Sequence, residues 1–354
     1  MKRIGIIGVG GIANGRHIPE LLNVTDCKIT AICDIDENAL SSTGDRLALD
    51  SEHRFTDYKK LIECNDVDAV EICTPNYLHI EMAEYAAQKG KPMNIEKPLC
   101  INAEEAGQLN AIIKDSNITN MMCFSYRFFP AVRYAKWIME KGLIGRVAGI
   151  NVEYLKSSAF MEGRRLDWRF VKKYAGTGVL GDLGVHLIDM AQLLVGDIKS
   201  VSAMKKIVVE QRMRLECDEF ADVETEDICN FIANIEDRNT GDNVIATFAI
   251  TRCAIGNQNT IKYNIYGTDG MISFNLNNPN EIGVCIGEVD KKSDGLHTVK
   301  VPNGFCITQE KAFIDSLNGN ICEYFPTLED GIRCQKVLDA VSKSADLGTF
   351  VNVE

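Results

Sequence analysis

The 354-residue sequence lacks any uninterrupted apolar run near the roughly 20 residues that a membrane helix needs. The N-terminal apolar run, residues 4–7, ends at Gly8 and is too short for the core of a signal peptide. Internal repeats and low-complexity segments are also missing from the sequence. These absences favour a globular protein that works in the cytoplasm rather than at a membrane.

Basic residues are also in short supply. There are 38 lysines and arginines against 50 acidic residues, which gives a net charge of -12. This balance argues against nucleic acid or an anionic membrane as the main partner. The thirteen cysteines form no Cys-x-x-Cys pair and no closely spaced Cys/His group. We therefore expect no metal site, and reduced, mostly buried thiols.

A glycine-rich segment near the N-terminus is the first positive signal. A short apolar strand, residues 3–7, is predicted to lead into a Gly-x-Gly-x-x-Ala pattern and then a helix. Such a turn lets the backbone approach a pyrophosphate, and the helix N-terminus supplies N–H donors to the phosphates. The residues predicted to bind the cofactor here are Gly8, Gly10, Gly11, Ile12 and Ala13.

Asp34 follows the second predicted strand, Cys27–Cys33, about 20 residues beyond the glycines. An acidic residue at that place is the expected partner of an adenosine ribose diol. It would also repel a 2′-phosphate, and the next residues, Ile35 and Asp36, offer no positive charge. The sequence therefore predicts NAD rather than NADP as the cofactor.

Strands and helices alternate through residues 1–124, with helices expected at residues 40–49 and 77–89, for example. This alternation is typical of a parallel, doubly wound α/β sheet, which binds ligands beyond the carboxyl ends of its strands. Polar residues follow two further predicted strands there. They complete the predicted cofactor-binding set: Thr74, Pro75, Asn76, His79, Glu96 and Lys97. In Glu96-Lys97-Pro98 the proline restricts the residue before it, which would hold the lysine ammonium at a strand end.

The pattern changes in residues 125–354, which we assign to a second, α+β domain. Strands are expected at residues 147–155, 200–210, 227–236, 243–253, 260–267 and 271–276, and helices at 305–316 and 328–344. Short polar connections between successive strands indicate a large, mainly antiparallel open sheet.

Asp182 and His186 lie at positions i and i+4 if the chain from Gly181 is helical. A histidine beside a carboxylate can be tuned for proton transfer near neutral pH. Three alternatives remain open from the residues alone: Asp182 as a helix cap, His186 as a buried core histidine, and a metal site that includes Asp189.

Together these motifs resemble the Gfo/Idh/MocA family of nicotinamide-dependent oxidoreductases. The resemblance rests on the glycine segment, Thr74–Asn76 with His79, Glu96–Pro98, Tyr126–Phe128 and the Asp182…His186 pair. It implies an N-terminal Rossmann domain and a C-terminal sheet through which the chain forms homodimers or homotetramers. It also implies a catalytic group of Lys97, Asp182 and His186, which would contact the substrate as well.

The expected reaction is oxidation of a secondary hydroxyl of a sugar or an inositol-like cyclitol by hydride transfer to NAD. Four residues are candidates to shape the polyol pocket: Tyr126, Arg127, Trp168 and Arg169. Two rival functions stay open, an NAD-dependent glycosidase that works by transient oxidation and elimination, and a nicotinamide-binding regulator without catalysis.

Overall fold

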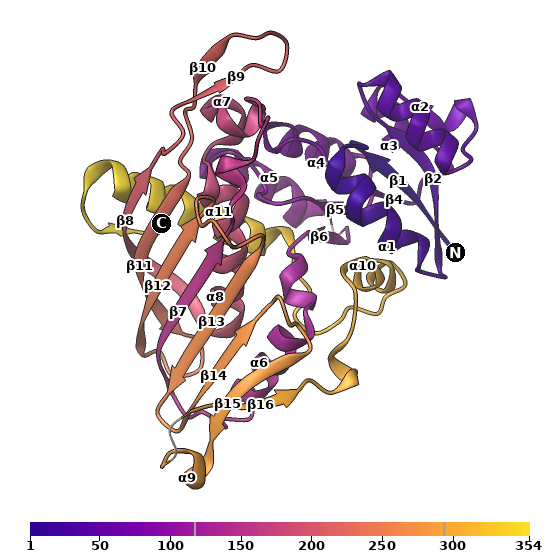
Figure 1. The fold of residues 1–354 in the computed structure, drawn as a ribbon. Coiled ribbons are helices and arrows are strands. Elements are labelled where there is room, and N and C mark those ends of the chain that lie inside the picture. The colour runs from indigo at the N-terminus through magenta and orange to yellow at the C-terminus, as the bar shows by residue number, and fades with distance from the viewer. Residues whose placement is uncertain (117, 293–294) are drawn as a thin grey trace. The chain divides into compact units, whose positions relative to one another are not determined.

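The computed structural model describes residues 1–116, 118–292 and 295–354 (Figure 1). Its contacts divide the chain into two compact units. The first comprises residues 1–125 and 307–335, and the second comprises residues 126–306 and 336–354. The expected boundary between residues 124 and 125 lies beside the first crossing, but the return of residues 307–335 to the first unit was not anticipated. No helix among the described residues is long and apolar enough to span a membrane.

The first unit is built on a six-stranded sheet in which every neighbouring pair is parallel. In spatial order its strands are β3 (Arg54–Phe55), β2 (Cys27–Cys33), β1 (Lys2–Ile7), β4 (Ala69–Ile72), β5 (Met93–Ile95) and β6 (Asn120–Met122). This 3-2-1-4-5-6 order is that of a dinucleotide-binding doubly wound fold, so the predicted parallel sheet is confirmed.

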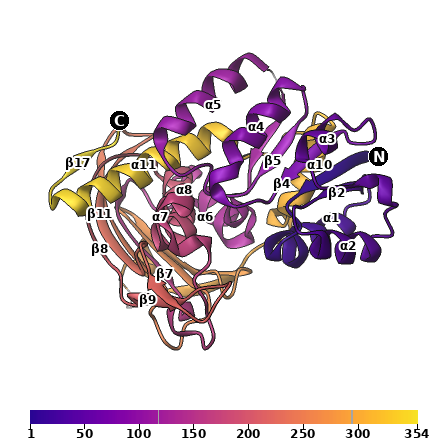
Figure 2. The same ribbon diagram turned by 90° about the horizontal axis from the view of Figure 1, so that it is seen from above.

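Helices cover both faces of this sheet. Figure 2 shows α1 and α2 on one side of the strands and α4 and α5 on the other. The helices are α1 (Ile18–Leu22), α2 (Glu37–Arg46), α3 (Tyr58–Glu63), α4 (His79–Gln88), α5 (Ala103–Ser116), α10 (Gln309–Leu317) and the first turns of α11 (Leu328–Leu347). The helix expected at residues 40–49 begins earlier because the Asp36 carboxylate caps it, accepting from the N–H groups of Asn38 and Ala39.

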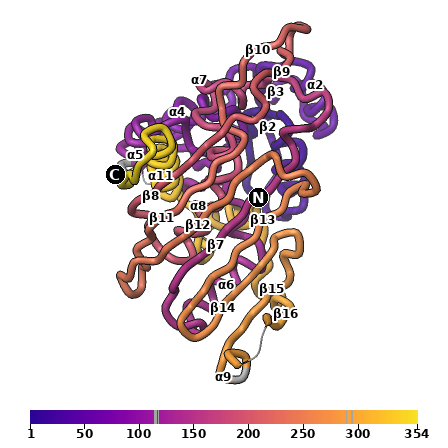
Figure 3. The backbone as a smooth tube through the Cα atoms, turned by 60° about the vertical axis from the view of Figure 1, so that its left-hand side comes forward, coloured from indigo at the N-terminus to yellow at the C-terminus, as the bar shows by residue number. Residues whose placement is uncertain are grey.

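The second unit holds a nine-stranded open sheet, which Figure 3 shows as a row of long strands. In spatial order the strands are β16 (His297–Lys300), β15 (Glu281–Ile286), β14 (Gly270–Asn275), β13 (Thr260–Gly267), β7 (Val147–Leu155), β12 (Asn243–Thr251), β11 (Ile228–Asp237), β8 (Gly196–Lys206) and β17 (Val351–Asn352). The pair β7 and β12 is parallel and the others are antiparallel. The predicted large, mainly antiparallel sheet is therefore confirmed.

Apolar residues alternate along these strands, and their buried side carries stacked rings such as Phe231 on Phe248, with centroids 4.2 Å apart. Two helices that contact this sheet are α6 (Pro130–Glu140) and α8 (Val185–Leu194). The unit also contains shorter helical segments: η6 (Trp168–Phe170), α7 (Lys172–Ala175), η7 (Leu180–Gly184) and α9 (Gly287–Asp290). A small hairpin pairs β9 (Gln211–Met213) with β10 (Phe220–Asp222).

Two boundaries in the second half of the chain differ from expectation. The strand expected at residues 200–210 runs instead from Gly196 to Lys206, because its pairing with β11 starts at Gly196. The helix expected from residue 305 begins at Gln309, where the hydroxyl of Thr308 accepts from the Lys311 N–H and caps it.

Candidate functional site

The glycine segment follows β1 and turns into a π-helical turn, η1 (Ala13–His17). Gly8 has a φ of +88°, and a Cβ there would stand 2.9 Å from the backbone of Cys73, so a side chain is excluded twice. At Gly10 and Gly11 a Cβ would meet no atom from elsewhere in the described chain within 4 Å. Ala13 is completely buried. The turn is therefore packed underneath and open above, as a backbone cradle for a pyrophosphate requires.

Asp34 lies just past the end of β2, half-buried. One carboxylate oxygen accepts the Val9 N–H at 2.8 Å and the other accepts the Asp36 N–H at 2.9 Å. These two bonds fix the carboxylate against the glycine turn and leave lone pairs for a ribose diol. The neighbouring Ile35 side chain is 88% exposed and offers no charge to a 2′-phosphate. The cradle and the carboxylate together fit NAD.

His79 is completely buried at the start of α4. Its Nε2 lies 2.8 Å from the Thr74 carbonyl oxygen and its Nδ1 lies 2.9 Å from the Pro98 carbonyl oxygen. Burial lowers the pKa of His79, although both carbonyls favour the charged ring. The ring thus braces two loops beyond β4 and β5. Binding of the cofactor by His79 stays a prediction.

Lys97 follows β5 at the same edge of the sheet, half-buried, and its peptide bond to Pro98 is cis. The Lys97 N–H donates to Glu96 Oε2 at 3.1 Å. The other oxygen of Glu96 lies 2.9 Å from Nε2 of the buried His17. The backbone that carries the Lys97 ammonium is therefore held by its neighbour's carboxylate, which is itself fixed in the protein interior.

Buried side chains near Glu96 include ligand types that metals use. The ligand atoms of His17, Glu71 and Cys73 lie within 4.8 Å of one another, and so do those of His17, Glu96 and Cys123. Both ring nitrogens of His17 already face carboxylate oxygens at hydrogen-bond distance. The ring is thus surrounded by acidic groups, with a hydrogen bond to Glu96 at Nε2 and ion-pair contacts with Glu71 and Glu310 at Nδ1.

In the second unit Asp182 lies within the π-helical turn η7, and His186 lies one residue into α8. Asp182 is half-buried and sits inside the helical turn rather than at its N-cap. Just before it, a Cβ on Gly178 would stand 2.1 Å from the Glu226 carbonyl oxygen. The Glu226 carboxylate accepts the N–H groups of Gly178 and Leu180 at 2.7 and 2.9 Å, which fixes the start of the turn.

His186 is 7% exposed, and its ring lies 4.4 Å from that of Tyr126, centroid to centroid. The hydroxyls of Tyr126 and Tyr154 are 2.8 Å apart, and Tyr154 donates to Asn259 Oδ1 at 2.8 Å. Burial, reinforced by Tyr126, raises the pKa of Tyr154 well above its usual value, so this hydroxyl stays protonated. The predicted Tyr126 thus lies beside the predicted His186, and Tyr154 and Asn259 extend the polar chain.

Arg127 is buried and paired with a carboxylate. It is 4% exposed, and its Nε and Nη2 donate to the Asp189 carboxylate at 2.5–3.0 Å. Asp189, considered above as a metal ligand, is thereby paired with a cation. The guanidinium of Arg169 stacks on the ring of Trp168 at 4.4 Å, and both side chains are partly exposed. Both side chains belong to η6.

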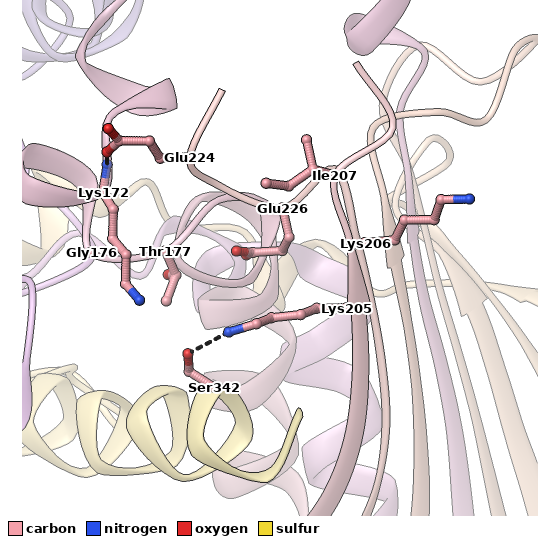
Figure 4. Close-up of a pocket in the computed structure, with 9 residues that line it drawn as sticks. All are labelled: Lys172, Gly176, Thr177, Lys205, Lys206, Ile207, Glu224, Glu226 and Ser342. Atoms are coloured by element: carbon pink, nitrogen blue, oxygen red, sulfur yellow. Dashed lines mark hydrogen bonds between the residues drawn. The ribbon is translucent and has the colours of Figure 1, made fainter. Parts of the chain in front are cut away.

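A cavity of about 240 Å³ lies elsewhere in the second unit (Figure 4). The residues that line it are Lys172, Gly176, Thr177, Lys205, Lys206, Ile207, Glu224, Glu226 and Ser342. Lys205 donates to the Ser342 hydroxyl at 3.1 Å, and the Lys206 side chain points away from the other lining residues (Figure 4). None of the residues predicted from the sequence to bind substrate lines it.

Comparison with known proteins identifies the family of this chain. Residues 2–124 match the oxidoreductase family model with an NAD-binding Rossmann fold, and residues 132–273 match the C-terminal domain model of the same family. A levoglucosan dehydrogenase of Pseudarthrobacter phenanthrenivorans is 33% identical over 273 residues, covering 73% of this chain and 70% of the relative. The chain belongs to the Gfo/Idh/MocA oxidoreductase family. Its first unit is an NAD-binding Rossmann domain, as predicted.

Relatives with a known activity cover almost the whole chain. Glucose-6-phosphate 3-dehydrogenase of Bacillus subtilis is 24% identical and covers 96% of this chain and 95% of its own. The solved structure of a levoglucosan dehydrogenase in complex with NADH and levoglucosan superposes with a TM-score of 0.87 at 27% identity, covering 99% of both chains. The family and the cofactor are thus settled, whereas the substrate differs between relatives.

Proposed function

We propose that this protein is an NAD-dependent dehydrogenase that oxidises a secondary hydroxyl of a sugar or cyclitol, with Lys97, Asp182 and His186 as its catalytic residues. The observation that carries the proposal is the placement of Lys97. Lys97 follows β5 at the strand-end edge of the NAD-binding sheet. Its N–H donates to Glu96, and the next carbonyl, that of Pro98, is hydrogen-bonded to His79, so the turn is held from two sides. Ligands of such sheets bind at this edge.

When bound, the nicotinamide accepts the hydride, and the residues position and polarise the alcohol. His186 takes the hydroxyl proton. The Lys97 ammonium donates a hydrogen bond to the reacting oxygen and stabilises its developing negative charge. Asp182 orients His186 or Lys97. The ring of Tyr126, which packs on His186, restricts the imidazole to few orientations.

The substrate pocket is proposed to include Tyr126 and the stacked pair Trp168 and Arg169, since an aromatic face beside a guanidinium suits a ring bearing many hydroxyls. Arg127, next to Tyr126 in the chain, is a further candidate for the pocket and is fixed by its buried pair with Asp189. The levoglucosan and glucose-6-phosphate dehydrogenases among the relatives support a carbohydrate substrate. We further propose a cytoplasmic homodimer or homotetramer that assembles through the open sheet of the second unit.

A reduction screen tests the proposal. Purified protein is incubated with NAD or NADP and a panel of levoglucosan and other anhydrosugars, inositols, aldoses and sugar phosphates, and absorbance of the reduced nicotinamide is followed. Steady NADH formation with one group of substrates supports the dehydrogenase. Sugar release from a glycoside without net NADH would instead show the glycosidase, and binding of NADH without any turnover across the panel would show the regulator.

A further inference from the structure

His17 stands at the centre of a buried charge cluster in the first unit. It ends η1, directly after the glycine turn, and is completely buried. Three carboxyl groups from three separate elements surround its ring: Glu71 on β4, Glu96 after β5 and Glu310 on α10. Glu96 Oε1 lies 2.9 Å from Nε2, while Glu310 Oε1 and Glu71 Oε2 lie 3.0 and 3.2 Å from Nδ1.

The proton inventory of this cluster favours a charged ring. Nε2 is hydrogen-bonded to Glu96, while Nδ1 makes no hydrogen bond among the described residues and lies at ion-pair distance from Glu71 and Glu310. Buried carboxylates need a positive charge beside them, which an imidazolium supplies and a neutral imidazole does not. Burial, together with Glu310, raises the pKa of Glu71 to about 8, so this carboxyl is protonated at neutral pH. Burial opposes charge on the ring of His17, but Glu310 and the other titratable neighbours outweigh it, so the pKa of His17 lies well above the usual value.

One carboxylate connects this cluster to Lys97. Glu96 uses Oε1 toward His17 and Oε2 to accept the Lys97 N–H at 3.1 Å. The Glu96 N–H in turn donates to the Ile72 carbonyl oxygen at 2.9 Å, which ties the turn to β4. The His17 ring therefore sets the orientation of the Lys97 backbone through two hydrogen bonds. The same residue ends the helical turn that follows the glycine segment.

We propose that His17 is a positioning residue for Lys97: its imidazolium holds the Glu96 carboxylate, and that carboxylate fixes the peptide N–H from which the Lys97 side chain extends. The inference rests on the proposed function, because it assigns His17 a role through the catalytic lysine. The titratable groups that face the ring are Glu71, Glu96, Glu310, Cys73 and Cys123.

The variants His17→Gln, Glu96→Gln and their double mutant form a cycle that tests this coupling. We expect each single variant to lower kcat roughly 10-fold to 100-fold, the scale at which a misplaced catalytic group reduces turnover. In His17→Gln the dissociation constant for NADH should change by less than about threefold, because His17 is not among the residues predicted to contact the cofactor. The double variant should be no slower than the slower single variant, since both act through one contact. His53→Gln, at the partly exposed His53 of the same unit, is the matched control and should behave like the parent.

The protonation state of the His17 ring is measured by ¹⁵N NMR of histidine-labelled protein without substrate. The signal that disappears in His17→Gln should show two protonated nitrogens at neutral pH. If that variant does not fold, the signal is assigned by elimination with Gln variants of the other four histidines. Metal analysis of the parent protein is run alongside, since a bound divalent metal would require a deprotonated ring nitrogen.

Four results would overturn the inference: parental kcat in folded His17→Gln, additive losses in the double variant, a ring with one proton, or a stoichiometric metal that His17→Gln loses. The variant Lys97→Ala distinguishes failure of this inference from failure of the proposed function. If Lys97→Ala keeps parental turnover, the proposed function fails. If Lys97→Ala is inactive and His17→Gln is not impaired, only the role of His17 fails.

Discussion

Lys97 and His186 are held in place by different forces. The turn that carries Lys97 is fixed by buried titratable groups, with His17 and Glu96 on one side and His79 on the other. His186 lies on a helix whose residues are all buried, against the ring of Tyr126. A position set by charges responds to pH and to single charge changes, whereas a position set by packing responds to volume. The two halves of one proposed site should therefore fail in different ways.

The largest expected effect comes from a buried ion pair on α8, the helix that carries His186. Arg127→Leu leaves the Asp189 carboxylate buried without its cation and should lower the free energy of unfolding by about 3–5 kcal/mol. Urea unfolding followed by circular dichroism measures it. The double variant Arg127→Leu/Asp189→Leu should recover most of the loss. A single variant as stable as the parent would contradict this expectation and would show that packing alone holds α8.

The next prediction concerns turnover and is the same for Lys97 and His186. Lys97→Ala and His186→Ala should each reduce kcat roughly 10²-fold or more, the usual scale for a positioned acid–base group. NADH binding, followed by protein fluorescence, should stay close to that of the parent. Lys89→Ala, at a partly exposed lysine paired with Glu63 in the first unit, is the matched control. Parental turnover in Lys97→Ala would remove that residue from the site.

A smaller effect is expected on cofactor affinity. Asp34→Ala removes a carboxylate that binds the glycine turn and is placed for a ribose diol, so NAD should bind about 10-fold more weakly, as for a lost hydrogen bond to a charged group. Isothermal titration calorimetry with NAD and NADP measures this change. Asp36→Ala, which removes only the cap of α2, should lower stability by about 1 kcal/mol and leave NAD affinity unchanged. Equal losses in both variants would assign Asp34 a purely structural role.

The last prediction uses pH to test the charge cluster around His17. The pKa of Glu71 is raised from its ordinary 4.5 to about 8, so the folded state binds this proton more tightly than the unfolded state. Its contribution is complete below about pH 4.5 and is lost as the pH rises toward 8. Glu71→Gln removes the titration, and its melting temperature relative to the parent should therefore increase between about pH 5 and pH 9. Scanning calorimetry across that range checks it, and a constant difference between the two proteins would contradict it.

Much of the fold follows from local sequence patterns. The strands Cys27–Cys33, Val147–Leu155 and Thr260–Gly267 have the bounds that alternation and apolar runs predict, because their buried faces leave a clear period in the sequence. The edge strand His297–Lys300 was not predicted because three of its four residues are exposed. Strand β17 has two residues and was likewise missed. Edge strands of this kind acquire their pairing from neighbours that no local pattern records.

The candidate site was predictable to the extent that its motifs are local. Gly8–Ala13, Asp34 and Glu96–Pro98 stand out because each follows an apolar strand. His17 did not, because its meaning depends on Glu310, nearly 300 residues further along the chain. Arg127 was predicted as a pocket residue from its type, while its buried partner Asp189 becomes visible only in the fold. How Lys97, Asp182 and His186 act together stays a prediction that turnover measurements can decide.

The return of residues 307–335 to the first unit has a consequence for anyone who dissects the gene. A recombinant fragment that stops near residue 124 would carry the whole parallel sheet but would lose α10, and Glu310 with it. The imidazole of His17 would then lack one of its three acidic neighbours, and the side of α1 that meets α10 would be exposed to water. A better minimal nucleotide-binding fragment would splice the later segment back through a short linker.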